Sequence, residues 1–351
     1  GIIFSTSQGF PIDWEAVYGS DLCTGPRKEF NMLELGKALD PDAAETVRLL
    51  FVYNANPAAT CPDQKAVRRG LMRTDLFTVV LEHFVTETAL YADILLPATT
   101  AWEHADLYTS YGHYGLQWAD KIMHPRGQAR SNCHIFQQLA RRLGFSDPMF
   151  YCSAKDLAQQ AVRRGPDGLN EANWQALWQG KPVKVLPKGA NPFAHGFSTS
   201  SGKVEIYSAA LAAQGLPPLP DYIPTGMDRD GLTLISVHPH EFINTSQVPL
   251  ARGDKCYQDL VALFNPADAA TFGLTSGQQV QLKSDSAEMV VTAKITAAVL
   301  QGTVVIQGIV PVSAVPGPTV NTLTSQELCD FGLGSTFSGI EVYPMTDPFK
   351  T

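Results

Sequence analysis

Polar side chains gather after two apolar segments in the first third of the chain. The apolar segments are Leu49–Tyr53 and Thr78–Glu82, and a helix-compatible segment lies between them. This order is typical of a β-turn-α-β unit, and open α/β sheets bind ligands beyond the carboxyl ends of their strands. The spacing therefore predicts one polar rim suited to a nucleotide, formed by Asn54, Asn56, Pro57, Glu82, Thr86, Glu87 and Thr88.

The Asn54-Ala55-Asn56-Pro57 motif allows two interpretations. Asn tolerates the left-handed conformation and bonds its own backbone, while Pro fixes φ, so the motif also fits a plain turn. Taken alone, it supports a turn and a ligand site equally. The longer pattern decides between them.

That longer pattern continues with Pro62-Asp63, the second apolar segment, and then ETALYADILLPA. It closely resembles the molybdopterin oxidoreductases of the dimethyl sulfoxide reductase family. In that family this segment holds the guanosine end of molybdopterin guanine dinucleotide, which implies cofactor-binding roles for the rim residues and for Asp63. The family usually has Gly where this chain has Asn54, a departure that concerns the turn conformation there and not the role of Asn56.

A second candidate site follows the apolar segment LTLISV. His238, His240 and Glu241 suggest a metal site, but Pro239 separates the histidines and no third ligand is obvious. A solvated loop is the plainer alternative. The resemblance favours pterin binding, because the family's H-x-x-x-N-[ST]-[ST] loop donates hydrogen bonds to the pterin. The residues that match it are His240, Asn244, Thr245 and Ser246, and Asn321 in VNTLT is the next pterin candidate, or else a turn residue.

Aromatic residues crowd a loop that also carries Gln117. Either they pack over a domain joint, or the loop lies along the cofactor or the substrate funnel. Many relatives, formate dehydrogenases included, have Gly-Thr and Arg-x-Gln where this chain has Asp106-Leu107 and Leu116-Gln117, which disfavours formate as the substrate. The aromatic residues are Tyr108, Tyr111, His113 and Tyr114.

Periodicity and turn residues predict the remaining elements. The fold class expected is α/β, with a partial Rossmann-like parallel sheet, followed by a small β-barrel that the resemblance implies is of the double-psi type. Predicted domains are 1–150, an α/β nucleotide-binding segment that is the C-terminal part of a split domain; 151–231, a helical and Pro/Gly-rich connection; and 232–351, the molybdopterin-dinucleotide-binding barrel.

Helices are expected at Met32–Leu39, from Pro62 to about Arg73, from Ser131 to Leu143, at Ala154–Arg164, at Glu171–Gln179 and after Asn265. A strand-like piece is expected at Lys203–Tyr207, and barrel strands at LTLISVH, QQVQLKS, EMVVTAKI and TVVIQ.

Composition narrows the class of protein. The 351 residues are 44% hydrophobic and 17% charged, with a net charge of -8, which fits a globular chain and disfavours nucleic acid and anionic membranes as partners. No apolar run approaches the ~20 residues that span a bilayer. The 6 cysteines form no C-x-x-C pair, so mostly buried free thiols and a cytoplasmic location are expected; because the chain starts with Gly, a periplasmic location stays open.

The resemblance covers nearly the whole chain in the right order, from GIIFSTSQGF to VNTLTSQELCDFG. It implies the C-terminal half of an oxidoreductase, as a fragment or a subunit, that binds molybdopterin guanine dinucleotide with Mo or W. Such an enzyme moves an oxygen atom or a hydrogen to or from a small substrate in two-electron steps. The metal ligand and any 4Fe-4S cluster are expected in the N-terminal half, which would be a partner, as would an iron-sulfur electron-transfer subunit.

Two other classes compete with this interpretation. A non-catalytic structural module, as in the large iron–sulfur subunit of respiratory complex I, keeps the fold without the metal. Its relatives tend to lose the pterin-contacting polar residues, whereas His240, Asn244, Ser246 and Asn321 are present here. A nicotinamide dehydrogenase is disfavoured because no Gly-rich fingerprint follows a strand.

Overall fold

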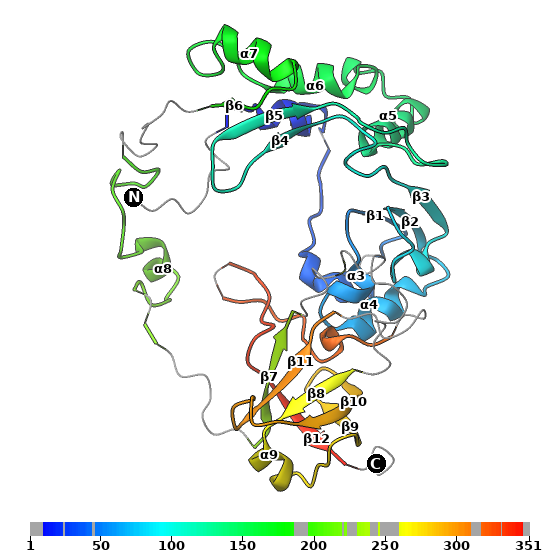
Figure 1. The fold of residues 1–351 in the computed structure, drawn as a ribbon, viewed down its shortest axis with the longest axis vertical. Helices are drawn as coiled ribbons and strands as arrows, with labels where there is room; N and C mark the ends of the chain where they lie inside the picture. The colour runs from blue at the N-terminus through cyan, green and yellow to red at the C-terminus, as the bar shows by residue number, and fades with distance from the viewer. Residues whose placement is uncertain are drawn as a thin grey trace. The chain divides into compact units, whose positions relative to one another are not determined.

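The chain forms two compact units in a computed structural model (Figure 1). The hairpin unit comprises residues 1–27 and 97–210, and the barrel unit comprises residues 28–96 and 211–351. Each unit combines two separate stretches of chain, so neither equals one of the contiguous ranges predicted from the sequence, and those domain ranges stay a prediction. The structure describes residues 10–23, 25–43, 46–185, 196–219, 221–222, 230–238, 245, 260–309, 317–330 and 332–346.

A small parallel sheet in the barrel unit confirms the predicted β-turn-α-β segment. Strand β1 (Leu49–Tyr53) runs parallel to β2 (Phe77–Glu82), and β3 (Ile94–Pro97) completes the order β1-β2-β3. Four consecutive residues of β2 are buried, as expected for a strand covered on both faces. The register pairs Tyr53 with Leu81, so the carboxyl ends of β1 and β2 meet at one edge.

Short helices connect these strands. Helix α3 (Pro57–Thr60) starts directly after the Asn-x-Asn turn, and α4 (Gln64–Leu71) follows it. The predicted helix start at Pro62 is wrong by two residues, because Asp63 is the N-cap and accepts a hydrogen bond from the amide of Ala66. The unit also contains η3 (Met32–Glu34) and α2 (Leu35–Ala38), which confirm the predicted helix there, and η4 (Ala89–Tyr91).

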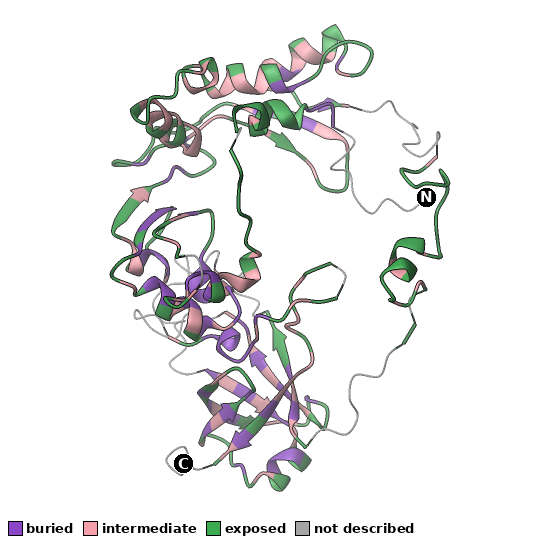
Figure 2. Cartoon of the chain, turned by 180° about the vertical axis from the view of Figure 1, so that it is seen from behind, coloured by how far each residue is buried: buried purple, intermediate pink, exposed green. Residues whose placement is uncertain are grey.

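The second part of the barrel unit is a closed barrel with strand order β10-β8-β11-β7-β12-β9. Inward and outward residues alternate along its strands, and the inward ones form a single apolar core (Figure 2). Four of its strands match the predicted segments, whereas β8 and β12 were not predicted. The elements are β7 (Leu232–Val237), β8 (Val261–Phe264), α9 (Pro266–Thr271), β9 (Gln279–Lys283), β10 (Glu288–Ile295), β11 (Thr303–Gln307), η8 (Val320–Thr322) and β12 (Ile340–Met345).

The hairpin unit surrounds an antiparallel sheet of order β4-β5-β6. Its core includes Leu116 and Trp118 of β5, which are 0% and 1% exposed, and Leu177 of α7. Three of its helices confirm predictions, and Ser131 caps α5 as expected. The elements are α1 (Trp14–Tyr18), η2 (Ser20–Leu22), β4 (Asp106–Thr109), β5 (Gly115–Ala119), α5 (Asn132–Arg142), η5 (Pro148–Phe150), α6 (Ala154–Ala161), α7 (Glu171–Trp178) and β6 (Val183–Lys184), and α8 (Ala209–Ala213) lies at the boundary of the units.

Two sequence predictions are wrong. Lys203–Tyr207 forms no strand; Val204 and Ile206 are 65% and 78% exposed, and alternation without a partner strand does not fix an extended conformation. The cysteines are not mostly buried: five are described and all five are free thiols, but only Cys61 is buried. Within the described residues, no helix has the length and apolar character needed to cross a bilayer.

Candidate functional site

The turn after β1 keeps the conformation that a glycine would favour. Asn54 has a φ of 51°, in the left-handed region, where Asn is tolerated better than most residues with a side chain. The side chain of Asn54 is exposed at the carboxyl end of the sheet. Asn54 therefore adopts the left-handed turn conformation and leaves a polar group exposed at the rim.

Asn56 ties the turn after β1 to the loop after β2. Its side chain is 4% exposed, and its Oδ1 accepts hydrogen bonds from the Thr88 amide at 3.1 Å and the Thr88 hydroxyl at 2.7 Å. Its Nδ2 donates to Glu87 Oε2 at 2.6 Å. The Thr88 hydroxyl in turn accepts from the amide of Ala58 at 3.0 Å. The hydrogen-bonded pair Asn56 and Thr88, which we call the rim latch, therefore fixes the rim residues from their buried side.

Two other predicted rim residues lie at the same edge and are more accessible than Asn56. Glu82 and Thr86 are half-buried, whereas Pro57 is buried as the first residue of α3. Glu82 Oε1 accepts from the amide of His83 at 2.7 Å, and the Thr86 hydroxyl accepts from the amide of Ala89. The outer rim thus offers carboxylate, amide and hydroxyl groups around the end of a parallel sheet.

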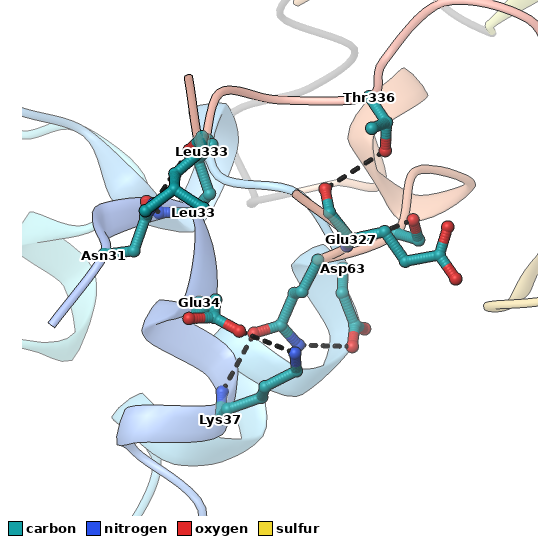
Figure 3. Close-up of polar contacts among 10 residues, drawn as sticks. Asn31, Leu33, Glu34, Lys37, Asp63, Glu327, Leu333 and Thr336 are labelled. Atoms are coloured by element: carbon teal, nitrogen blue, oxygen red, sulfur yellow. Dashed lines mark hydrogen bonds and ion pairs between the residues drawn. The ribbon is translucent and has the colours of Figure 1, made fainter. Parts of the chain in front are cut away.

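Asp63 faces the closing segment, which we define as residues 317–330. Its Oδ2 accepts from Gln326 Nε2 at 2.8 Å (Figure 3). Its amide donates to the carbonyl of Thr324 at 3.0 Å. Gln326 also accepts from the amide of Lys37 at 2.9 Å. A Cβ atom on Gly36 would lie 2.8 Å from Gln326 Nε2, so this close approach requires glycine.

Asn321 of the closing segment packs against the end of α3. It is 6% exposed, and its Nδ2 donates to the carbonyls of Ala59 at 3.1 Å and Thr60 at 3.0 Å. Both amide hydrogens are therefore used within the protein. Within the described residues, its Oδ1 accepts no hydrogen bond, so this oxygen keeps its capacity to accept one.

Two residues of α4 were missed by the sequence analysis. Gln64 is 1% exposed: its Nε2 donates to the Ala58 carbonyl at 2.8 Å, and its Oε1 accepts from the Thr319 amide at 2.9 Å and the Thr322 hydroxyl at 2.8 Å. Arg68 donates to the carbonyls of Ala58 at 3.2 Å and Gly317 at 2.6 Å. Burial lowers the pKa of the Arg68 guanidinium, while Tyr91 and Glu87 act in the opposite direction. Gln64 and Arg68 are four positions apart on one helix, next to apolar positions, so the sequence does indicate that both side chains lie on the same face.

Gln117 lies in the hairpin unit, on β5 opposite Tyr108 of β4, and its side chain is exposed. Tyr111 at the hairpin turn is 81% exposed. Burial raises the pKa of the Tyr108 hydroxyl, and Asp106 adds to that shift. Gln117 and the two tyrosines are therefore exposed on the β4–β5 hairpin of this unit.

The predicted pterin loop after β7 is described at few positions. His240, Asn244 and Ser246 lie outside the described residues, and Thr245 is half-buried. Among the residues that the structure describes, no three His, Cys, Asp or Glu side chains gather where they could hold a metal ion.

The fold and the rim together define an α/β dinucleotide-type site linked to a β-barrel, and comparison with known proteins gives the family. Residues 24–142 match the family model "Molybdopterin oxidoreductase", and residues 232–340 match "Molydopterin dinucleotide binding domain". The chain belongs to the molybdopterin enzymes of the dimethyl sulfoxide reductase family.

Individual relatives agree with this assignment. The "Probable oxidoreductase YoaE" of Bacillus subtilis is 37% identical over 96% of this chain and 50% of its own length. The "Dimethyl sulfoxide/trimethylamine N-oxide reductase" of Cereibacter sphaeroides is 27% identical over 81% of this chain and 38% of its own length. The chain therefore spans about half, or less, of the length of these relatives.

The fold is similar to that of a solved structure. "Acetylene Hydratase from Pelobacter acetylenicus" superimposes with a TM-score of 0.70 at 21% identity, over 90% of this chain and 46% of that one. At this identity the likeness concerns the fold alone.

Proposed function

We propose that this chain is the cofactor-binding part of an oxidoreductase that uses molybdopterin guanine dinucleotide with Mo or W and acts on a small substrate. One observation carries the proposal. Buried hydrogen bonds join α3 and α4, the helices that follow the rim turn after β1, to the closing segment, although the bonded residues Gln64 and Thr319 lie 255 positions apart in sequence. This linkage between the rim and the closing segment suits a long ligand that has a polar group at each end.

The residues present fit such a group. Guanine offers N–H donors that carboxylates and amide oxygens accept, and Glu82 and Asn54 supply both at the accessible part of the rim. Thr86 would add a hydroxyl there. At the pterin end, Asn321 would accept through Oδ1, and His240, Asn244, Thr245 and Ser246 would donate.

Asn56 and Thr88, whose polar groups already bond within the protein, have a different role. Asn56 and Thr88 would hold the outer rim in shape, because their polar groups are buried and bonded to one another. When bound, the cofactor supplies two-electron redox chemistry, moving an oxygen atom or a hydrogen. The chain's own residues bind and orient the dinucleotide and exclude water from it.

The proposal also concerns the rest of the protein. We place the metal ligand, and any 4Fe-4S cluster, in polypeptide equivalent to the other half of the relatives, with an iron-sulfur subunit as a further partner. Apolar side chains exposed on the sheet suit such a partner: Leu49 is 61% exposed and Phe77 is 47% exposed. We further propose a double-psi barrel, which the parallel pairs β10–β8 and β11–β7 within a closed barrel support. Gln117 would contact cofactor or substrate from the hairpin unit.

Cofactor analysis of the intact protein tests the proposal. Purified protein should contain molybdenum or tungsten, and acid treatment should release guanine nucleotide in proportion to the metal. Metal is measured by mass spectrometry and nucleotide by chromatography on the same sample. An intact protein that contains neither would refute the proposal and support a structural module of an electron-transfer complex.

A further inference from the structure

Gln64 is a buried amide that connects three separate pieces of chain. It is the first residue of α4, and its side chain bonds to Ala58 in α3 and to Thr319 and Thr322 around η8. The groups it meets are themselves buried, since Ala58, Thr319 and Thr322 are 0%, 3% and 7% exposed. No water replaces a lost partner easily at such a position.

A neutral amide satisfies all three partners at once. The Ala58 carbonyl needs a donor, whereas the Thr319 amide and the Thr322 hydroxyl need an acceptor. A side-chain amide carries both on one carbon atom. A carboxylate would lack the donor, and an ammonium would lack the acceptor. An apolar group would leave the Thr319 amide and the Thr322 hydroxyl without this acceptor, while the Ala58 carbonyl would keep only its bond from Arg68.

The contacts of Gln64 continue into both proposed cofactor regions. On one side, the Asn56 carbonyl accepts from the amides of Ala59 and Thr60, so α3 is fixed to the rim latch. On the other side, Thr319 Oγ1 accepts from the amide of Asn321, whose Nδ2 donates back to α3. Gln64 bonds both to α3 and to the closing segment, and Arg68 adds a second link through the carbonyls of Ala58 and Gly317.

We propose that Gln64 is a positioning residue that couples the nucleotide rim to the closing segment. It makes the proposed guanosine contacts and the proposed pterin acceptor of Asn321 one pre-organised unit, so that both ends of the dinucleotide are held together. This inference rests on the proposed function for its ligand. The linkage itself concerns the protein alone and is measurable without cofactor.

Two substitutions test the linkage. Gln64→Met keeps the volume and removes every polar contact. Gln64→Glu keeps the shape, and its protonated carboxyl has one donor and one acceptor, like the native amide. Gln279→Met, on an exposed position of the barrel, is the matched control.

The first measurement is hydrogen exchange at the backbone amides of residues 319–323, expressed as protection factors in the full-length protein. Gln64→Met should lower protection there at least about tenfold, which corresponds to about 1.4 kcal/mol, and Gln279→Met should not. Gln64→Glu should be weakly protected at neutral pH and regain protection as pH falls and its carboxyl is protonated; burial raises the pKa of that carboxyl, and the neighbouring Arg68 guanidinium lowers it.

The pH rescue is specific to position 64. Asp63 and Lys65 adjoin Gln64 in sequence, and Arg68, on which Glu87 and Tyr91 act, bonds to the same Ala58 carbonyl. The Cys61 thiol has a pKa raised to about 11 by burial, and α3 and η8 carry no titratable side chain. Wild type and Gln64→Met contain all of these groups, so a pH effect seen only in Gln64→Glu arises at that carboxyl.

The second measurement is guanine nucleotide retained per chain after dialysis of the loaded protein. Gln64→Met should retain several-fold less than wild type, and Gln279→Met should retain the wild-type amount. Unchanged protection at 319–323 in Gln64→Met, or lowered protection with normal nucleotide retention, would overturn the coupling. A wild-type protein that holds no nucleotide would instead refute the proposed function, while the exchange result would still decide whether Gln64 fixes the segment.

Discussion

The barrel and the three-stranded sheet share one unit but are stabilised in opposite ways. The barrel closes on itself and buries one large apolar core, in which Phe264, Leu282 and Ile306 are each 0% exposed. The sheet has only three strands, and its apolar clusters are small. Leu49, Phe77 and Ile94 on its strands are 61%, 47% and 43% exposed.

We infer from this difference that the barrel mainly stabilises the unit, whereas the sheet and its polar network position the ligand-binding groups. The barrel needs no further partner to satisfy its strands, because closure removes the edges. Around the sheet, a buried polar network takes the place of a large core and fixes the polar rim. Hydrogen bonds of this kind add only modest net stability, yet they specify where each group lies. We therefore expect the sheet to be the less stable region and the more sensitive to binding.

Hydrogen exchange should show the largest contrast. Amides in Val280–Ile306 should exchange roughly a hundredfold more slowly than those around Leu49–Thr88 in the isolated chain, because local opening is easier where few apolar contacts are broken. Adding polypeptide equivalent to the other half of the relatives should slow exchange in the sheet and leave the barrel unchanged. Equal protection of both regions in a monomer without a partner would show that the sheet is self-sufficient.

Removing the rim latch should have the next largest effect. Asn56→Leu leaves the Thr88 amide and hydroxyl without their acceptor, at a cost of about 1–3 kcal/mol in the free energy of opening the rim. Cofactor content should fall while the barrel stays folded, as judged by nucleotide analysis and circular dichroism.

A matched variant controls for the loss of an Asn side chain. Asn170→Leu removes the N-cap of α7 in the hairpin unit, where Asn170 accepts from the amide of Asn173. It should lower stability by about 1 kcal/mol without affecting the nucleotide. Normal cofactor loading in Asn56→Leu would contradict the assigned role.

Local sequence signals, namely the alternation of apolar residues and the helix caps, predicted most of the individual strands and helices. Alternation gave β7, β9, β10 and β11, and the caps at Ser131 and Asn265 were recognised correctly. The order strand, Asn-x-Asn-Pro, strand placed Asn54, Asn56, Glu82 and Thr88 at one edge, because parallel pairing forces their neighbours together. Strand β8 was missed because it is short, and β12 contains Pro344, which lowers its strand signal.

Long-range polar pairing was not predictable in this way. Nothing near Gln64 in the sequence indicates that its partners lie at positions 319 and 322, since the contact depends on how the chain returns to the sheet. The same holds for Asp63 and Gln326. Asn56 and Asn321 were predicted as ligand-binding residues, and the structure adds that most of their hydrogen-bonding capacity is used internally.

The buried thiol of Cys61 should be less reactive than the thiols of the exposed cysteines, and the difference depends on pH. Burial raises its pKa from 9.0 to about 11, so the neutral form is favoured in the folded state. Its contribution to stability is complete below pH 9 and is lost as pH rises towards 11. Iodoacetamide at pH 8 should label Cys23 and Cys329 and spare Cys61, as measured by peptide mass spectrometry. Comparable labelling of Cys61 would show that the segment around α3 opens readily.

The smallest expected effect is at Asn54, where two variants distinguish a role in the turn conformation from a direct contact with guanosine. Asn54→Ala should cost about 1 kcal/mol, because alanine at a φ of 51° is strained more than asparagine, whereas Asn54→Gly accepts that φ without strain. Denaturant titration gives the stability of each variant, and nucleotide analysis gives its cofactor content. If the exposed side chain contacts guanosine, both variants should lose nucleotide, although only Asn54→Ala loses stability. If Asn54 serves the turn alone, Asn54→Gly should retain nucleotide like wild type, and the rim would then bind through Glu82 and Thr86 without it.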